Sequence, residues 1–389
     1  MSRILAVSHS RIWPVRSGSA IRRLMILEAL AAVGEVDLLY VGEVDGWGAA
    51  VPADSPVRAV REFPVRRVRP GALARFRWLI RPDVPLQLME WERRAPEAGW
   101  GDYDVVWYFR PIAYELASGV SGRRVIVDLD DLEDTKLLQA SALPGNRRPF
   151  HQRVAERRNV GAWRHYQRRI AEEVDAVTVA NVGDRAALPV GRCHVVPNGF
   201  PDVPAIAESR PSPRLLLVGQ FEYGPNADAA EFFVREIFPF IRASRPDAVV
   251  RLVGRDSRRV RRLAGDGVEV TGEVDDLAAE YTRAGVAVSP VRYGSGTRVK
   301  ILEAFARGVP TVSTSIGAAG LGTVHGEHLL IADDAESFAR SCIEVLTDDQ
   351  LRRHLIGHAH SLLRRGYSQA AVTEAVRRVL FPAGNAAGW

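Results

Sequence analysis

One stretch of the sequence, residues 286–321, restricts the fold more than any other. It begins with the apolar run Val286–Val288, which is long enough for a buried strand and too short for a helix. Pro290 ends this strand, and the glycines within 294–296 let the backbone turn tightly and approach a ligand closely. A helical pattern follows, so the stretch predicts a strand, a glycine loop and a helix in succession.

The helix is predicted over Arg298–Arg307, with Thr297 as a favourable N-cap and Gly308 at the C′ position. Apolar runs of strand length alternate with helical patterns along the rest of the chain. Further strands are predicted at Arg3–Ser8, Val36–Val41, Val105–Phe109, Arg124–Leu129, Leu215–Val218 and Val249–Val253. This alternation is typical of a parallel α/β sheet.

The glycine loop before this helix predicts an anion site, because free N–H groups and the helix dipole both favour a negative ligand there. Arg298 and Lys300 oppose the dipole, a cost that makes sense if a diphosphate binds between them. A lysine is unusual here, since Lys136 and Lys300 are the two lysines among 52 Lys+Arg. Two other interpretations stay open: both residues are solvated surface charges, or Lys300 forms an i,i+3 ion pair with Glu303.

The segment resembles the donor-binding signature of family 4 retaining glycosyltransferases with the GT-B fold, P-x-x-x-G-x-G-T-[R/x]-x-K-x-x-E-A-x-A-x-G-x-P-x-V. The resemblance implies that Arg298 and Lys300 hold a nucleotide diphosphate and that Glu303 binds the ribose hydroxyls. Many members carry a glutamate eight residues before Glu303, where this chain has Ser295. The implied donor-binding positions in this loop and helix are Gly294, Ser295, Gly296, Thr297, Arg298, Lys300 and Glu303.

The resemblance extends over essentially the whole chain. Residues 194–199 resemble a V-x-P-N-G turn that closes the first domain, and 219–233 resemble G-x-x-x-x-x-P-N-x-D. Gln220 stands in this second loop, where some relatives place basic residues. Further donor-binding positions are predicted at Gly18, Gln220, Arg255 and Val274. Gly18 follows the first strand, where it either admits the donor or merely makes the turn, and no G-x-G-x-x-G supports dinucleotide binding.

Four acids follow the apolar strand in RVIVDLDDLED, residues 124–134. One interpretation is a D-x-D metal site of the kind that GT-A transferases use. The other places Asp130 and Asp131 where GT-B relatives carry His-Asp beside the donor sugar. The GT-B donor signature decides for the second, so Asp130 and Asp131 join Arg298 and Lys300 as candidate catalytic residues. Neither a metal nor a cofactor is expected beyond the nucleotide sugar itself.

The resemblance and the length of 389 residues predict two Rossmann-like doubly wound parallel-sheet domains facing a central cleft. The predicted divisions are 1–205 for the acceptor-side domain, 206–365 for the donor domain and 366–389 for a helix crossing back to the first domain. No apolar run approaches the roughly 18–20 residues that span a bilayer. Two cysteines are too few for a disulfide framework, which favours a cytoplasmic protein. The strong preference for arginine over lysine is typical of a GC-rich bacterium.

Basic residues gather in two segments. Residues 58–94 hold ten arginines against four acids, and 147–169 hold eight arginines against one glutamate. Such segments are most often solvated helix faces, but with interleaved aromatics they also suit an anionic membrane or a phosphorylated acceptor. No nucleic-acid-binding motif accompanies them. The chain is therefore expected to contact a membrane peripherally, if at all, and not nucleic acid.

Together these features predict a retaining hexosyltransferase that moves a sugar from a nucleoside diphosphate to a small-molecule, glycolipid or glycan acceptor. UDP is the expected nucleotide, with GDP and dTDP as alternatives. Two other functions stay open, because Ser295 replaces a usual sugar contact. One is a nucleotide-sugar binding protein without transfer, and the other is a GT-B nucleotide-sugar epimerase.

Overall fold

A computed structural model describes residues 2–15, 17–43, 51–80, 84–92, 102–117, 119–120, 122–142, 149–188, 191–200, 212–255, 258–294 and 299–382. The chain divides into two compact units. Unit 1 comprises Met1–Asn198 with Gln369–Trp389, and unit 2 comprises Gly199–Ser368. The sequence placed the divisions at 205/206 and 365/366.

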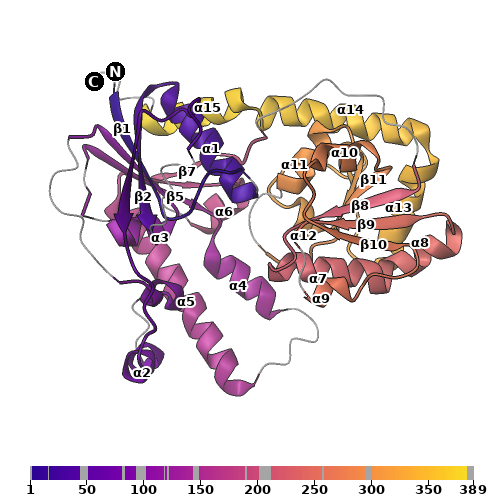
Figure 1. Ribbon diagram of the computed structural model, residues 1–389, viewed down its shortest axis with the longest axis horizontal. Helices are drawn as coiled ribbons and strands as arrows, with labels where there is room; N and C mark the ends of the chain where they lie inside the picture. The colour runs from indigo at the N-terminus through magenta and orange to yellow at the C-terminus, as the bar shows by residue number, and fades with distance from the viewer. Residues whose placement is uncertain are drawn as a thin grey trace. The chain divides into compact units, whose positions relative to one another are not determined.

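Unit 1 is built on a seven-stranded parallel sheet in the order β3-β2-β1-β4-β5-β6-β7 (Figure 1). Its strands are β1 Ser2–Ser8, β2 Gly34–Gly42, β3 Ala59–Pro64, β4 Val105–Phe109, β5 Arg124–Asp130, β6 Ala176–Val179 and β7 Cys193–Val195. The central strands are buried on both faces, as continuous apolar runs in a parallel sheet require. The order reverses direction between β1 and β4, which makes this pair the switch point of the sheet.

Helices cover both faces of the sheet in unit 1. The helices of this unit are α1 Gly18–Ala31, α2 Ala72–Ile80, α3 Pro111–Ala117, α4 Glu133–Ser141, α5 Phe150–Glu173, α6 Val182–Ala187 and α15 Gln369–Leu380, with a short 3₁₀ helix, η2, at Leu86–Glu90. Of these, α2 does not take part in covering the sheet. Alternate residues of β1 face opposite layers, Ile4 toward α1 and α15 and Leu5 toward α3 and α5. The C-terminal helix α15 thus packs beside α1 in the first unit.

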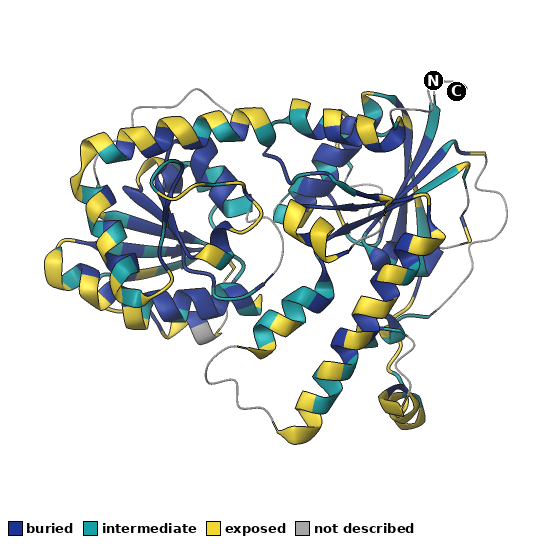
Figure 2. Cartoon of the chain, turned by 180° about the vertical axis from the view of Figure 1, so that it is seen from behind, coloured by how far each residue is buried: buried dark blue, intermediate teal, exposed yellow. Residues whose placement is uncertain are grey.

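Unit 2 repeats this plan with six parallel strands in the order β10-β9-β8-β11-β12-β13. The strands are β8 Arg214–Val218, β9 Val249–Val253, β10 Val268–Gly272, β11 Val286–Ser289, β12 Thr311–Ser313 and β13 Leu330–Ile331. Figure 2 shows these strands as the buried centre of the unit. The order reverses between β8 and β11, so the switch point lies beside the stretch from which the sequence analysis began.

The helices of unit 2 are α7 Gly224–Phe232, α8 Phe238–Ser244, α9 Arg258–Arg261, α10 Leu277–Thr282, α11 Val299–Ala306, α12 Ser315–Ala318, α13 Ala335–Thr347 and α14 Asp349–Gly366, with a π turn, η3, at Phe233–Ile237. One sheet face packs against α7, α8 and α13, and the other against α10 and α11. Gly308 has φ of +66° directly after α11, which confirms its predicted place at the end of that helix.

The predicted fold class is confirmed: both units are doubly wound α/β structures with all-parallel sheets. The predicted strands are present, with ends that differ by up to two residues. The predicted helix at 298–307 is described from Val299 to Ala306, while its N-cap Thr297 lies outside the described residues. No helix within the described ranges is both long and apolar enough to cross a membrane.

Candidate active site

The carboxyl ends of β8 and β11 carry the residues that the sequence assigned to the donor. These strands pair directly, with Val286 opposite Leu215 and Ala287 opposite Leu216. The chain leaves β8 into the loop before α7 and leaves β11 into the loop before α11. In open parallel sheets, ligands bind outside the strand ends at such a point, because the two loops diverge there.

Lys300, in the first turn of α11, is held by the loop that follows β8. Its Nζ donates a hydrogen bond of 2.8 Å to the amide oxygen of Asn226 on α7. Asn226 in turn donates from Nδ2 to the backbone oxygen of Gln220 over 3.0 Å. The ammonium group is therefore fixed in place at the switch point by residues 74 positions away in the sequence.

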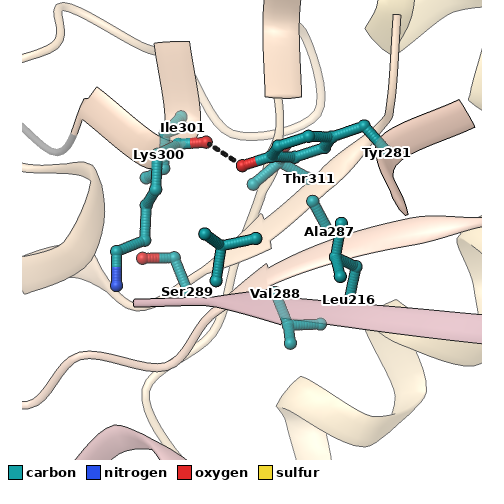
Figure 3. A pocket seen from close by; sticks show the side chains of 9 residues that line it. Leu216, Tyr281, Ala287, Val288, Ser289, Lys300, Ile301 and Thr311 are labelled. Carbon is teal, nitrogen blue, oxygen red and sulfur yellow. Dashed lines mark hydrogen bonds between the residues drawn. The ribbon is translucent and has the colours of Figure 1, made fainter. Parts of the chain in front are cut away.

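Glu303 lies one turn further along α11 and contacts Tyr281 of α10. The Tyr281 hydroxyl donates to the backbone oxygen of Lys300 at 3.2 Å and lies 3.5 Å from Glu303 Oε2 (Figure 3). Burial raises the pKa of Glu303 to about 7, and Arg307 and Tyr281 oppose this shift only in part. No ion pair joins Glu303 to Lys300 where the chain is described, so the i,i+3 pair does not explain these two residues.

A small cavity lies beneath Lys300, between α11 and strands β8, β11 and β12 (Figure 3). Its lining includes Ser289, Tyr281 and Thr311. Ser289 Oγ is buried and has no hydrogen-bond partner among the described residues. The space is of the size that holds about one water molecule, which would satisfy this hydroxyl. This cavity is too small for a nucleotide, so it lies next to the predicted donor site and is not itself that site.

A second interaction fixes the loop after β11 to α7. Arg292 forms a bidentate ion pair with Asp228, with Nε–Oδ2 and Nη2–Oδ1 distances of 3.0 and 2.7 Å. The guanidinium also stacks 4.5 Å over the ring of Phe232. Bidentate pairs of this kind fix orientation as well as distance. The start of the glycine loop is thereby anchored to the same helix that orients Lys300.

The other donor positions predicted from the sequence lie on the neighbouring loops. Gly294 is buried with φ of +117°, and the backbone oxygen of Arg255 accepts from Phe221 at 2.8 Å while its side chain is exposed. Val274 packs against the cluster that contains Tyr281. Ser295, Gly296, Thr297 and Arg298 lie outside the described residues. The structure thus brings together Gln220, Lys300 and Glu303 through Asn226 and Tyr281, which the sequence analysis did not assign.

In unit 1, Asp130 and Asp131 follow directly on one another at the carboxyl end of β5. Asp130 has φ of +61° and its carboxylate lies 2.9 Å from Arg110 Nη1 and 3.4 Å from Arg22 Nε. Asp131 is half-buried next to it. Gly18, also in unit 1, is the first residue of α1, after the N-cap Ser17. The roles of Asp130, Asp131 and Gly18 toward the donor stay predictions.

Asp128 has a structural role in unit 1. Arg22 donates to both its carboxylate oxygens, at 2.9 and 2.6 Å, and Thr178 Oγ1 donates to Oδ1 at 2.7 Å. Burial alone would lower the pKa of Arg22, but Asp128 and Asp130 hold it above its ordinary value. Arg22 further donates to the oxygens of Val196 and Asn198 at 2.8 Å each. The first acid of the D-x-D sequence therefore forms a buried structural pair.

Comparisons with known proteins agree with this class of fold. Sucrose-phosphate synthase from Thermosynechococcus elongatus superimposes with a TM-score of 0.69 at 20% identity, covering 96% of each chain. The Anabaena protein HepE, in a complex with UDP-glucose, gives a TM-score of 0.63 at 14% identity over 98% of this chain and 99% of that one. Two doubly wound domains of this kind define the GT-B fold.

The sequence comparisons find similarity to glycosyltransferases. Residues 212–348 match the family Glycosyl transferases group 1. The phosphatidyl-myo-inositol mannosyltransferase of Mycolicibacterium smegmatis is 27% identical over 320 residues, which cover 79% of this chain and 77% of the relative. The lipopolysaccharide core glycosyltransferase LpsE of Rhizobium meliloti is 37% identical over 82 residues, 21% of this chain and 24% of LpsE. Residues 212–348 therefore resemble glycosyl transferases group 1, within a chain that has the GT-B fold.

Proposed function

We propose that the protein is a retaining, metal-independent hexosyltransferase that uses a nucleoside diphosphate sugar. UDP is the expected nucleotide, with GDP and dTDP as alternatives, and the acceptor is a small molecule, a glycolipid or a glycan. The observation that carries this proposal is the Lys300 ammonium, oriented by Asn226 at the switch point of unit 2. The similarity to a mannosyltransferase and to a UDP-glucose complex supports it.

The proposed reaction breaks the bond between the anomeric carbon and the diphosphate oxygen. Negative charge then builds on the diphosphate and positive charge on the sugar ring. Lys300 and Arg298 stabilise the first of these, and preorganised cations at such a site contribute several kcal/mol to the transition state. Glu303 holds the ribose hydroxyls. A donor phosphate oxygen takes the proton of the acceptor hydroxyl as the new glycosidic bond forms on the same face.

Thermal shifts with UDP, GDP and dTDP sugars provide the direct test of the donor. A shift with one nucleotide series is expected, followed by slow release of free nucleotide when that sugar donor is incubated with the protein. Isomerised donor in place of free nucleotide would indicate the epimerase, and binding without any turnover would indicate the idle binding protein. Donor hydrolysis should continue in EDTA. Loss in EDTA and recovery with Mn²⁺ would overturn metal independence.

We also propose that unit 1 contacts an anionic membrane surface through α2. This helix is almost entirely exposed (Figure 2). The apolar side chains of Leu73, Phe76 and Ile80 are 60–68% exposed. Arg75 and Arg77 are exposed on the same short helix. Exposed apolar side chains interleaved with arginines suit the interface of an anionic bilayer, where both kinds of group find a partner. Arg158 of α5 fixes the end of α2 by donating to the Ile80 oxygen at 3.1 Å.

Sedimentation with vesicles tests this contact. The wild-type chain should bind vesicles of phosphatidylcholine with phosphatidylglycerol more strongly than phosphatidylcholine alone, and added salt should weaken the difference. The double variant Phe76→Ser, Ile80→Ser should lose most of the binding. Leu138→Ser, at another exposed leucine of unit 1, serves as the matched control. Equal binding of both vesicle types by all three proteins would contradict the proposal.

A further inference from the structure

The switch point of unit 1 also gathers polar side chains, but of a different kind. His9 follows β1 and Arg110 follows β4, and these two strands are paired from Ile4–Val105 to Ser8–Phe109. Arg110 has φ of +77°, and Asp130 beside it has φ of +61°. Non-glycine residues in this left-handed region are strained, and such strain gathers at ligand sites. Arg23 of α1 belongs to the same group of polar side chains.

Arg22 and Arg23 are neighbours on α1 and are both buried, with 2% and 6% exposure. Arg22 has a complete set of partners, including the bidentate contact with Asp128. Within the described part of the chain, Arg23 makes one hydrogen bond, from Nη2 to the backbone oxygen of Arg11 at 2.9 Å. Its Nε is buried and has no hydrogen-bond partner among the described residues. Buried charges are normally paired, because an isolated one loses its hydration without return.

The surroundings of Arg23 make this lack of a partner more costly. Burial and the nearby Arg110 lower the pKa of Arg23 to about 10, against the opposing charges of Asp130 and Asp128, so it stays protonated at neutral pH. The carboxylates of Asp130 and Glu133 contact Arg110 instead, at 2.9 and 3.3 Å. The positive charge of Arg23 therefore lies in a partly positive environment with no anion of the described chain in contact.

His9 completes the group. Burial, Arg23 and Arg110, in that order, lower the pKa of His9 to about 3, so its imidazole is neutral. An interaction with the Phe109 backbone opposes this shift, and Arg67 adds a smaller lowering contribution. Its Nε2 lies 2.9 Å from Ser10 Oγ, while Nδ1 is buried without a partner in the described part of the chain. When the Ser10 hydroxyl donates to Nε2, the ring proton is on Nδ1. His9 then offers a neutral donor beside the guanidinium of Arg23.

We infer that this switch point binds the phosphate group of a phosphorylated acceptor, with Arg23 as its principal cation and His9 as a neutral donor. A phosphate oxygen supplies the acceptor that Arg23 Nε lacks, and guanidinium geometry suits phosphate. The inference rests on the proposed function insofar as the bound molecule is the sugar acceptor. The phosphate belongs either to a soluble metabolite or to a lipid headgroup, since both present the same oxygens.

Calorimetry in phosphate-free and sulfate-free buffer at low ionic strength tests the site. The probes are glycerol 3-phosphate, glycerate and glycerol, which share a backbone and differ in the anionic group. Dihexanoyl phosphatidylglycerol, kept monomeric, represents the lipid source. We expect glycerol 3-phosphate or the short-chain lipid to bind more tightly than glycerate, and glycerol to bind not at all. The tighter of these two ligands identifies the source of the phosphate.

Two substitutions separate binding from structure. Arg23→Met should weaken binding of the phosphate probe roughly 10- to 100-fold, as expected for losing a charge-assisted hydrogen bond. Its melting temperature should stay equal to that of the wild type or rise, because an unpaired buried charge is removed. Arg23→Lys keeps the charge and should recover part of the affinity. Arg123→Met is the control, at an arginine whose side chain is 77% exposed and which directly precedes β5, at the amino end of that strand.

The outcomes decide the assignment. Unchanged phosphate affinity in Arg23→Met, or an equal loss in Arg123→Met, would overturn it, as would equal binding of glycerol and glycerol 3-phosphate by the wild type. If Arg23→Met does not fold, phosphate binding is compared between the wild type and the variants Arg23→Lys and His9→Gln. Unchanged phosphate affinity in both variants would also overturn the assignment. UDP binding is measured in parallel, so a failure of the donor assignment is distinguished from a failure of this site.

Discussion

The amide oxygen of Asn226 accepts a hydrogen bond of 2.8 Å from the ammonium group of Lys300. Because Asn226 also donates to the backbone oxygen of Gln220, its amide orientation is fixed and the lysine is held by a neutral acceptor. A neutral acceptor orients the ammonium without cancelling its charge. A carboxylate at the same place would compete with a diphosphate for this charge, which the amide oxygen of Asn226 does not do.

Removing this acceptor should weaken nucleotide binding without removing the charge. Asn226→Ala is expected to lower UDP affinity about 3- to 10-fold, the effect of one neutral hydrogen bond. Asn226→Asp should lower it further, since an ion pair would hold Lys300 away from the diphosphate. Calorimetry measures both, with the exposed Thr347→Ala as the control. Tighter UDP binding by Asn226→Asp than by the wild type would exclude this role.

Lys300 itself should affect binding and turnover together, because its charge acts in the ground state and in the transition state. Lys300→Ala is expected to lower UDP affinity roughly 10- to 100-fold, the effect of one charge-assisted hydrogen bond. Arg298→Ala should behave similarly, and the double variant should be less than additive if both contact one diphosphate. Unchanged nucleotide affinity in both single variants would contradict the proposal that the diphosphate binds at this helix.

The sheets were predictable because buried parallel strands are continuous apolar runs. Val105–Phe109 and Val249–Val253 were predicted with the bounds that the structure shows. The glycine after α11 was predictable as well, since its left-handed conformation favours glycine. These features depend on residues close together in the sequence, so a local pattern is sufficient to identify them.

The polar networks were not predictable in the same way. Asn226 and Lys300 are 74 positions apart, and Arg22 and Asp128 are 106 apart. Their contacts depend on the strand order, which brings β8 beside β11 and places α1 beside the end of β5. Asn226 stood in the quoted P-N-x-D sequence, but nothing local assigned it to Lys300. Tyr281 carried no signal, because a tyrosine on a short helix is usually a core residue.

Arg22 and Asp128 should make a large contribution to the stability of unit 1. Removing one partner leaves a buried charge without compensation, so Asp128→Asn or Arg22→Met should cost about 3–5 kcal/mol of unfolding free energy. The double variant Arg22→Met, Asp128→Asn should lose less than the sum of the single variants. Urea denaturation measures all three. Additive losses would show that the two residues act independently.

Glu303 should distinguish ribonucleotides from their 2′-deoxy analogues. Its carboxylate can accept two hydrogen bonds from a ribose diol, and losing one charged partner costs about 1.5–3 kcal/mol. Glu303→Gln should therefore weaken UDP more than dUDP, once uridine nucleotides are shown to bind. Calorimetry gives the two affinities for each protein. If their ratio is the same in the variant as in the wild type, Glu303 does not bind the ribose.

The raised pKa of Glu303 predicts how stability depends on pH. Burial raises this pKa from 4.5 to about 7, so the neutral form is favoured in the folded state. The folded state then binds more protons than the unfolded state between these two values. The contribution of Glu303 to the unfolding free energy is therefore highest at about pH 4.5 and below, and it falls as the pH rises through 7.

The size of this decline follows from the shift in pKa, and is on the order of 3 kcal/mol over the whole interval. Glu303→Gln, which cannot ionise, should abolish it. Chemical denaturation of both proteins at pH 5 and pH 8 gives the difference: the wild type should lose stability relative to the variant at the higher pH. Saturating UDP should reduce that loss if ribose hydroxyls solvate the charged carboxylate. A constant difference between the two proteins at both pH values would show that Glu303 is already ionised at pH 5.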